Sequence, residues 1–239
     1  INNPITGILN YAQFAADQCA GQSSVLELLG QVTSEAERIA RIVSTLMAFA
    51  HQGDEDISVL QLSDVVDHAL QLVGCQMRKD GIRLELDCAE NLPYVKAAGR
   101  ELEHVVVNLL SNARWALNRK YGSRHDDKAI RIGLATITHD GREWLSMTIR
   151  DSGIGMTEDV QLRACDPFYT TKPEGQGVGL GLAVCLAVVA DHGGKLWFDS
   201  VVGEYTQANV SLPLMSSADS DIGPQLRYSP ISSRFQAST

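Results

Sequence analysis

Apolar residues recur in alternating steps of four and three through the first fifty positions of the chain. One series runs from Ile1 to Cys19 and a second from Val25 to Phe49, separated by the polar residues 21–24. This spacing puts apolar side chains on one face of a helix, and the short polar break predicts a turn between two helices. We therefore expect residues 1–52 to form an antiparallel helical hairpin. One hairpin cannot bury both its seam and its flank, so we expect a homodimer that completes a four-helix bundle.

After a polar linker the pattern becomes a mixture of strand-like and helix-like segments. The predicted order is a helix capped by Ser63, a strand at 82–88, a helix at 101–118, strands at 130–134 and 145–149, a helix at 179–192, and strands at 195–201 and 208–212. This mixed order favours an α+β sandwich, with helices on one sheet face, over a doubly wound fold. We expect this domain to span residues 53–214. The serine-rich residues 215–239 lack hydrophobic periodicity and are expected to be a disordered tail.

Composition narrows the class of protein without identifying it. The chain is 44% hydrophobic, which supports a packed core, and its formal charge of −9 argues against a nucleic-acid partner, which would need a basic face. The five cysteines are scattered, without metal-ligand spacing, and indicate reduced thiols in the cytoplasm. No apolar run approaches the ~20 residues that span a bilayer. The chain opens without Met inside an apparent helix, so we expect a fragment; a membrane anchor elsewhere in a longer protein stays open.

Two asparagines on the helix predicted at 101–118 are the first candidate for chemistry. Asn108 and Asn112 stand four positions apart, so their amides project from the same helix face. Asparagine is a mediocre helix former, and a solvated polar stripe is one interpretation of the pair. The alternative is a pair of neutral oxygen ligands for Mg²⁺, which keeps waters and takes further oxygens from phosphates.

An Asp/Gly-rich turn follows the predicted strand at 145–149. Asp151, Gly153 and Gly155 occupy alternate positions there. An aspartate at a strand end can accept a hydrogen bond from an exocyclic amine, while glycines let the backbone approach a flat base. Turns after strands are often rich in these residues for structural reasons alone, so this segment by itself is a weak signal.

A glycine-rich segment leads into the helix predicted at 179–192. Lys172 is followed by Gly177, Gly179 and Gly181, which alternate just before the apolar run that begins at Leu182. Such glycines expose backbone N–H groups to an anion, and a helix N-terminus favours negative charge. The segment is neither a P-loop nor a dinucleotide-binding fingerprint. The polar stretch before it suits a mobile lid over phosphates. The alternative is a flexible loop in which the glycines only allow turns.

The order and spacing of these segments resemble the N, G1, F and G2 boxes of sensor histidine kinases, part of the wider ATPase class that contains gyrase, Hsp90 and MutL. The likeness covers residues 1–214 and includes the stretch 1–9, which resembles the segment that follows the phosphoacceptor histidine. It implies a Bergerat-type sandwich with a mixed sheet, binding ATP and Mg²⁺. The implied cofactor-binding set is Asn108, Asn112, Asp151, Gly153, Gly155, Phe168, Lys172, Gly177, Gly179, Gly181, Leu182 and Thr206.

The resemblance also implies particular roles. Asn112 would bind Mg²⁺ with help from Asn108, which also positions the reacting groups. Asp151, assisted by Gly155 and Thr206, would hold adenine. The three glycines would line the phosphates, with Lys172 reaching one of them. Asn3 stands where members with phosphatase activity orient water.

The chain departs from the family pattern at several positions. Tyr205 stands where glycine is usual and Ala208 where phenylalanine is common, which weakens the adenine-side assignment of Thr206. Trp115 follows the N box at a position near which some members use a lysine. The pattern puts the phosphoacceptor histidine two positions before Ile1, so this histidine and its neighbouring acid are absent. None of the six histidines present lies on the first predicted helix, and we reject a replacement.

The sequence thus predicts an ATP:protein-histidine phosphotransferase module that passes phosphate to an aspartate of a response-regulator receiver domain. An ATP-hydrolysing machine is the first rival, but such machines use a glutamate at the position of Asn108, and an amide cannot accept a proton. A degenerate, non-enzymatic ATP-binding dimerisation module is the second rival, which the intact nucleotide segments disfavour.

Overall fold

The computed structural model describes residues 57–139, 141–173 and 177–214, together with 25–33 and positions 8, 11, 12, 15 and 36. Residues 25–33 are helical, in agreement with the second predicted helix. Most of the predicted hairpin and all of the predicted tail lie outside the described residues.

A five-stranded mixed sheet forms one layer of the domain. Its strand order is β2-β4-β5-β7-β6, and β2 pairs in parallel with β4 whereas all other neighbours are antiparallel. The strands are β2 (Arg83–Cys88), β4 (Ala129–His139), β5 (Arg142–Asp151), β6 (Lys195–Val201) and β7 (Tyr205–Pro213). The predicted α+β class and mixed sheet are therefore confirmed.

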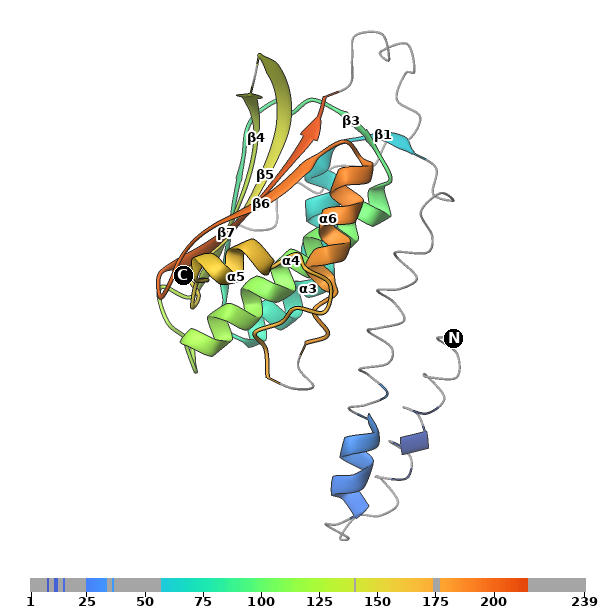
Figure 1. Cartoon of the computed structure of the whole chain (residues 1–239), viewed down its shortest axis with the longest axis vertical. Helices are drawn as coiled ribbons and strands as arrows, with labels where there is room; N and C mark the ends of the chain where they lie inside the picture. Colours follow the sequence, from blue (N-terminus) through green and yellow to red (C-terminus); the bar gives the residue numbers. More distant parts are fainter. Residues whose placement is uncertain are drawn as a thin grey trace.

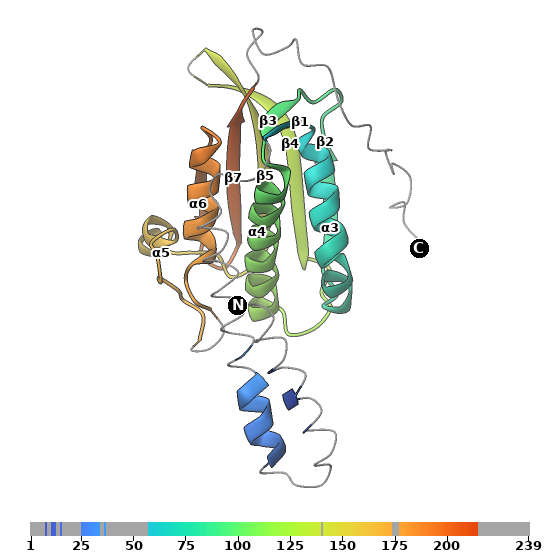
Figure 2. The same cartoon turned by 90° about the vertical axis from the view of Figure 1, so that its right-hand side faces the viewer.

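Three helices cover one face of the sheet. They are α3 (Leu62–Lys79), α4 (Gly99–Lys120) and α6 (Gly181–Asp191), and α4 packs between the other two. Figure 2 looks onto this layer, with the three helices side by side in front of the strands. Figure 1 shows the two layers from the side, and Figure 2 shows the short α5 (Glu158–Arg163) beside the lower part of α6.

Alternation along the strands explains which face is covered. Ile130, Ile132, Leu145 and Met147 point to the helices and are no more than 2% exposed. Residues between them point to the open face, where Arg131 is exposed and Ser146 is buried. Because strand side chains alternate with a period of two, one apolar face packs on the helices and the other stays largely polar.

A small second sheet joins the start of α3 to the start of α4. Strands β1 (Ser58–Leu60) and β3 (Val95–Ala97) pair antiparallel, with Ser58 opposite Ala97. The sequence analysis did not predict these strands, because three residues are too few to establish alternation. Their pairing fixes where α4, which carries both asparagines, begins.

Candidate functional site

A cavity of about 870 Å³ lies between α4, α6 and the ends of β5 and β7. Its walls bring together the three segments singled out in the sequence. The predicted site residues that line it are Asn108, Asn112, Asp151, Gly155, Lys172, Gly177, Gly179, Gly181, Leu182 and Thr206. Segments that are up to about a hundred positions apart along the chain therefore meet around one space.

The two asparagines lie one turn apart on α4 and are both half-buried in the cavity wall. The Lys172 ammonium donates to Asn112 Oδ1 at 2.7 Å and also lies 5.4 Å from the centre of the Trp115 ring. A Cβ atom at Gly181 would lie 3.2 Å from Asn108 Oδ1, so this amide oxygen faces the N-terminus of α6. Both side chains thus present oxygen atoms at the glycine-rich end of the cavity, and one of them already faces a positive charge.

Asp151, the last residue of β5, is only 4% exposed. The backbone N–H of Gly153 donates to Asp151 Oδ1 at 2.8 Å. Burial raises the pKa of this carboxyl from 3.8 to about 7, and the Gly153 hydrogen bond and the charges of Lys120 and Arg150 oppose this rise only in part. Because Asp151 lines the cavity and a carboxylate has about four acceptor sites, its side chain can also accept a donor from a molecule there.

Thr206 pairs with Asp151 across β5 and β7, so the two side chains share the helix-facing side of the sheet. A small network orients its hydroxyl. Ser200 Oγ accepts from the Met156 N–H at 2.8 Å, donates to the Tyr205 carbonyl at 2.7 Å and lies 3.0 Å from Thr206 Oγ1. Because the Ser200 proton points to the carbonyl, Thr206 donates to Ser200, and its own lone pairs stay available.

Ser200 was missed by the sequence analysis, and so was its strand neighbour Phe198, which lines the cavity. Phe198 lies directly opposite Ala208 on the adjacent strand. Phe198 therefore places an aromatic ring in the cavity wall from β6, next to Ala208, the position at which the family commonly has phenylalanine. Tyr205, which stands where the family usually has glycine, does not obstruct the cavity, because its ring lies 3.6 Å from the Arg150 guanidinium.

Two glycines are required where backbones approach closely. Gly155 has φ +68°, and a Cβ there would lie 2.1 Å from the Val201 carbonyl oxygen. Gly179 has φ +73°, and a Cβ there would lie 2.4 Å from the Phe168 carbonyl carbon. Neither position tolerates a side chain without backbone movement, so both glycines shape the cavity wall.

The remaining predicted site residues lie elsewhere. Phe168 is 71% exposed with φ +67°, and its N–H donates to the Gly179 carbonyl at 2.8 Å, but its side chain does not line the cavity. Gly153 lies behind Asp151, where a Cβ would meet Ala116 at 2.7 Å. Asn3 lies outside the described residues, so its role stays a prediction.

Of the described histidines, His104 lines the cavity one turn before Asn108 on α4, and the others do not line it. His192 follows α6 and is buried; its Nε2 accepts from the Ala98 N–H at 2.9 Å, and its Nδ1–H donates to the Val188 carbonyl at 2.8 Å. His139 is the last residue of β4. In the described part of the chain, no three His, Cys, Asp or Glu residues gather as metal ligands. No helix there is long and apolar enough to cross a membrane.

Residues 97–216 match the family described as histidine kinase-, DNA gyrase B-, and HSP90-like ATPase. The match covers half of the chain, and it includes every residue of the cavity wall. The chain belongs to this ATPase family.

Sequence relatives of the ATPase domain are sensor histidine kinases. The sensor histidine kinase ZraS of Salmonella typhi is 28% identical over 218 residues, which cover 90% of this chain and 44% of ZraS. Sporulation kinase E of Bacillus subtilis is 26% identical over 219 residues, covering 92% of this chain and 28% of that protein. The chain thus spans less than half the length of these relatives. The resemblance to the catalytic domain of a sensor histidine kinase is confirmed.

Solved structures share the fold of the ATPase domain. Full-length ShkA, crystallised in complex with AMPPNP, matches with a TM-score of 0.66 at 18% identity, over 90% of this chain and 44% of ShkA. The histidine kinase AdeS of Acinetobacter baumannii matches with a TM-score of 0.58 at 17% identity, over 89% of this chain and 96% of AdeS.

Proposed function

We propose that this chain is the ATP-binding catalytic module of a two-component histidine kinase, and that the cavity between α4 and α6 holds Mg-ATP. The observation that carries this proposal is the polarity of the cavity. A buried carboxylate, Asp151, stands at the sheet end, and amide oxygens, Lys172 and a helix N-terminus stand at the glycine-rich end. A ligand with a hydrogen-bond donor on a flat base and a polyphosphate on its other end matches both ends.

Adenine would occupy the sheet end. The Asp151 carboxylate would accept from the exocyclic amine, and Thr206 and the backbone at Gly155 would approach the same base edge. The aromatic ring of Phe198 would supply apolar surface to the base. Guanine presents an oxygen where adenine has its amine, so an ionised Asp151 would repel it and select ATP.

The phosphates would lie at the glycine-rich end, where N–H groups at the start of α6 favour an anion. The residues present fit a magnesium ion, because Asn112 Oδ1 already accepts from the Lys172 ammonium, a cation that the metal would replace. Asn112 and Asn108 would hold the ion through amide oxygens, with phosphate oxygens and water completing its shell. Bound Mg²⁺ would neutralise phosphate charge, and Lys172, once displaced from Asn112, would contact a phosphate.

Transfer to a separate nucleophile is favoured over hydrolysis. An amide at Asn108 cannot take a proton from water, so the domain has no general base at this position. Catalysis would then consist of positioning and charge stabilisation, with an imidazole nitrogen attacking the γ-phosphorus as the bond to the β-phosphate oxygen breaks. The phosphoryl group would pass on to an aspartate of a response-regulator receiver domain. The predicted helical hairpin would supply both the homodimer interface and the receiver's docking surface, in the cytoplasm.

A phosphoryl-transfer assay tests the proposal. The 239-residue chain, incubated with radiolabelled Mg-ATP, should give no stable phosphoprotein, because none of its six histidines lies between residues 1 and 50. Extending the chain before Ile1 by a His-Glu pair and two turns of helix should yield an acid-labile, base-stable phosphohistidine. The extended chain with Asn112→Ala is the control and should stay unlabelled. Labelling of the unextended chain would contradict this assignment, and so would an extended chain that binds Mg-ATP without becoming labelled.

A further inference from the structure

A second cavity lies at the opposite side of α4 from the nucleotide cavity and shares no lining residue with it. It has a volume of about 710 Å³ and is formed by the end of α3, the start of β2 and the loop that joins α4 to β4. Nothing in the proposed kinase function uses this cavity, so its chemistry needs an account of its own.

The cavity is strongly positive in an acidic protein. Five Lys or Arg and two Asp residues line it, although the chain as a whole carries a formal charge of −9. A concave wall of one charge sign focuses the electrostatic field and concentrates counter-ions of the other sign. The local excess of cations therefore favours an anionic occupant.

The acidic side chains of the wall do not cancel this excess. Asp80 Oδ2 accepts from Arg114 Nε at 2.5 Å and from Asn118 Nδ2 at 2.6 Å, and the Arg114 hydrogen bond holds the pKa of Asp80 below its usual range. The charge of Asp80 is thus already paired with an arginine that does not line the cavity. Asp126 is exposed and its carboxylate offsets one of the five cations, so the wall keeps an excess of positive charge.

The floor of the cavity contains a buried cation. Lys128 is only 2% exposed, and its ammonium donates to the Asp80 carbonyl at 2.8 Å and, at 3.5 Å, to the Ser123 carbonyl. No carboxylate of a described residue forms an ion pair with Lys128. Burying a charge is costly unless a partner of opposite sign is present, and the Asp80 carboxylate, which attracts Lys128, is also hydrogen-bonded to Arg114.

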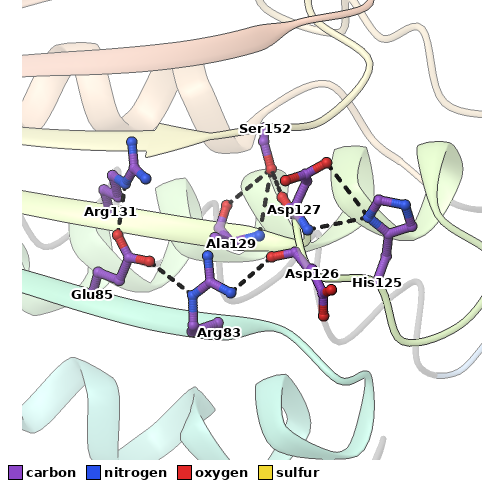
Figure 3. Close-up of polar contacts among 8 residues, drawn as sticks. All are labelled: Arg83, Glu85, His125, Asp126, Asp127, Ala129, Arg131 and Ser152. Atoms are coloured by element: carbon purple, nitrogen blue, oxygen red, sulfur yellow. Dashed lines mark hydrogen bonds and ion pairs between the residues drawn. The ribbon is translucent and has the colours of Figure 1, made fainter.

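The wall is held in shape before any ligand arrives. Figure 3 shows Arg83 between Glu85 and the backbone of Asp126, to which its Nε and Nη1 donate at 2.8 and 2.7 Å. Arg131 donates to the other oxygen of Glu85 at 2.6 Å, and Ser152 hydrogen-bonds the Asp127 carbonyl. These contacts anchor the loop to both neighbouring strands, so little ordering would be needed on binding.

We propose that this cavity binds a small molecule carrying one or more phosphate groups. Lys128 would face the anion from the floor. Lys79 and Arg124 line the cavity, are exposed, and form no ion pair within the described parts of the chain, so both are available to a ligand. The volume exceeds what a single ion needs and matches a metabolite-sized ligand. A guanidinium fork and ammonium groups together suit a multivalent phosphate better than a single carboxylate.

Pyrophosphate without added metal is a suitable probe of this cavity. Amide NMR signals of the 239-residue chain report where it binds. At constant ionic strength, saturable shifts should appear at Gly122 and Ser123. The nucleotide cavity, if it also takes pyrophosphate, would show separate shifts at Gly179 and Gly181. Shifts confined to Gly179 and Gly181 would overturn the proposal. Citrate, a carboxylate anion, should bind at least tenfold more weakly, and equal affinity would overturn the assignment to phosphate.

Paired variants test the named cations. The double variant Lys79→Ala, Arg124→Ala should weaken the pyrophosphate response at Ser123 by tenfold or more, because each substitution removes a charge-assisted contact. The matched control, Lys96→Ala with Arg142→Ala, removes two exposed cations outside the cavity and should stay within twofold of the unmodified chain. An equal loss in both double variants would mean unspecific attraction, and an unchanged response in the first would equally overturn the site.

Discussion

Replacing Asp151 by asparagine should stabilise the empty domain at pH 8 while weakening its binding of adenine nucleotides. The reason is that the carboxyl is only 4% exposed, and backbone N–H donors such as that of Gly153, at 2.8 Å, offset its burial only in part. An ionised carboxylate in this position lacks the hydration that it has in the unfolded chain. The proposed function supplies its missing partner only when adenine is bound.

The pKa of Asp151 gives the size of the effect. Raising this pKa from 3.8 to about 7 means that ionising the group lowers the free energy of unfolding by at most about 4 kcal/mol. Because the folded pKa is the higher one, the stability contributed by this group is present at low pH and is lost as pH rises from about 4 to 7. Asp151→Asn removes the charge but places an amide in the same pocket, so we expect a gain of about 1–3 kcal/mol at pH 8.

Urea unfolding without nucleotide, followed by tryptophan fluorescence at pH 5 and pH 8, measures this effect. The advantage of the asparagine variant should shrink by about 1.4 kcal/mol per pH unit below 7, and should disappear or reverse at pH 5. The matched control Asp87→Asn, at an exposed position on β2, should change stability by less than about 0.5 kcal/mol. A variant that is destabilised at pH 8, with the same pH dependence as the unmodified chain, would refute the argument. Full retention of the preference for ADP over GDP would refute the adenine contact.

Three further changes test separate parts of the account. Gly155→Ala should destabilise the fold by about 2–4 kcal/mol in the same urea assay, because the added Cβ would meet the Val201 carbonyl. The control Gly203→Ala, at φ +78° in open space, should cost only about 1–2 kcal/mol. Phe198→Ala should weaken ADP binding about 5- to 30-fold in calorimetry with little change in the ATP/GTP preference, and unchanged affinity would exclude a base-stacking role. Sedimentation equilibrium at tens of micromolar should show a homodimer that is lost when residues 1–52 are removed; a ~26 kDa monomer of the whole chain would contradict this interface.

Much of the fold could be predicted because its elements are long and strongly patterned. The helix expected at 101–118 is α4, Gly99–Lys120, and the strand expected at 145–149 is the centre of β5, Arg142–Asp151. Errors occur at the ends of elements, where local signals compete. Helix α3 begins at Leu62 with Gln61 as its N-cap, so the predicted capping by Ser63 is wrong. The packing of Leu62, which is 1% exposed, extends the helix past the serine.

The cavity was predictable in part for a related reason. Asn108, Asp151 and Gly179 lie in compact motifs, where spacing alone places each side chain on a helix face or at a turn. Ser200 and Phe198 lie on β6, whose alternating pattern predicts a strand but not the neighbour that each side chain meets. The place of Phe198 in the cavity wall and the contact of Ser200 with Thr206 depend on strand order, because β6 pairs with β7 rather than with β5. The positive cavity behind α4 likewise joins residues from three elements and has no signature in sequence spacing.

Calorimetric titration of the 239-residue chain with AMPPNP tests the central claim most directly. We predict one site per chain, with affinity in the micromolar to millimolar range in excess Mg²⁺, and at least tenfold weaker binding in EDTA. Asn112→Ala should abolish most of this metal dependence while leaving ADP binding without metal nearly unchanged, because Asn112 lies at the phosphate end and not at the sheet end of the cavity. No binding at millimolar nucleotide, or binding that is indifferent to both EDTA and the loss of Asn112, would contradict the account.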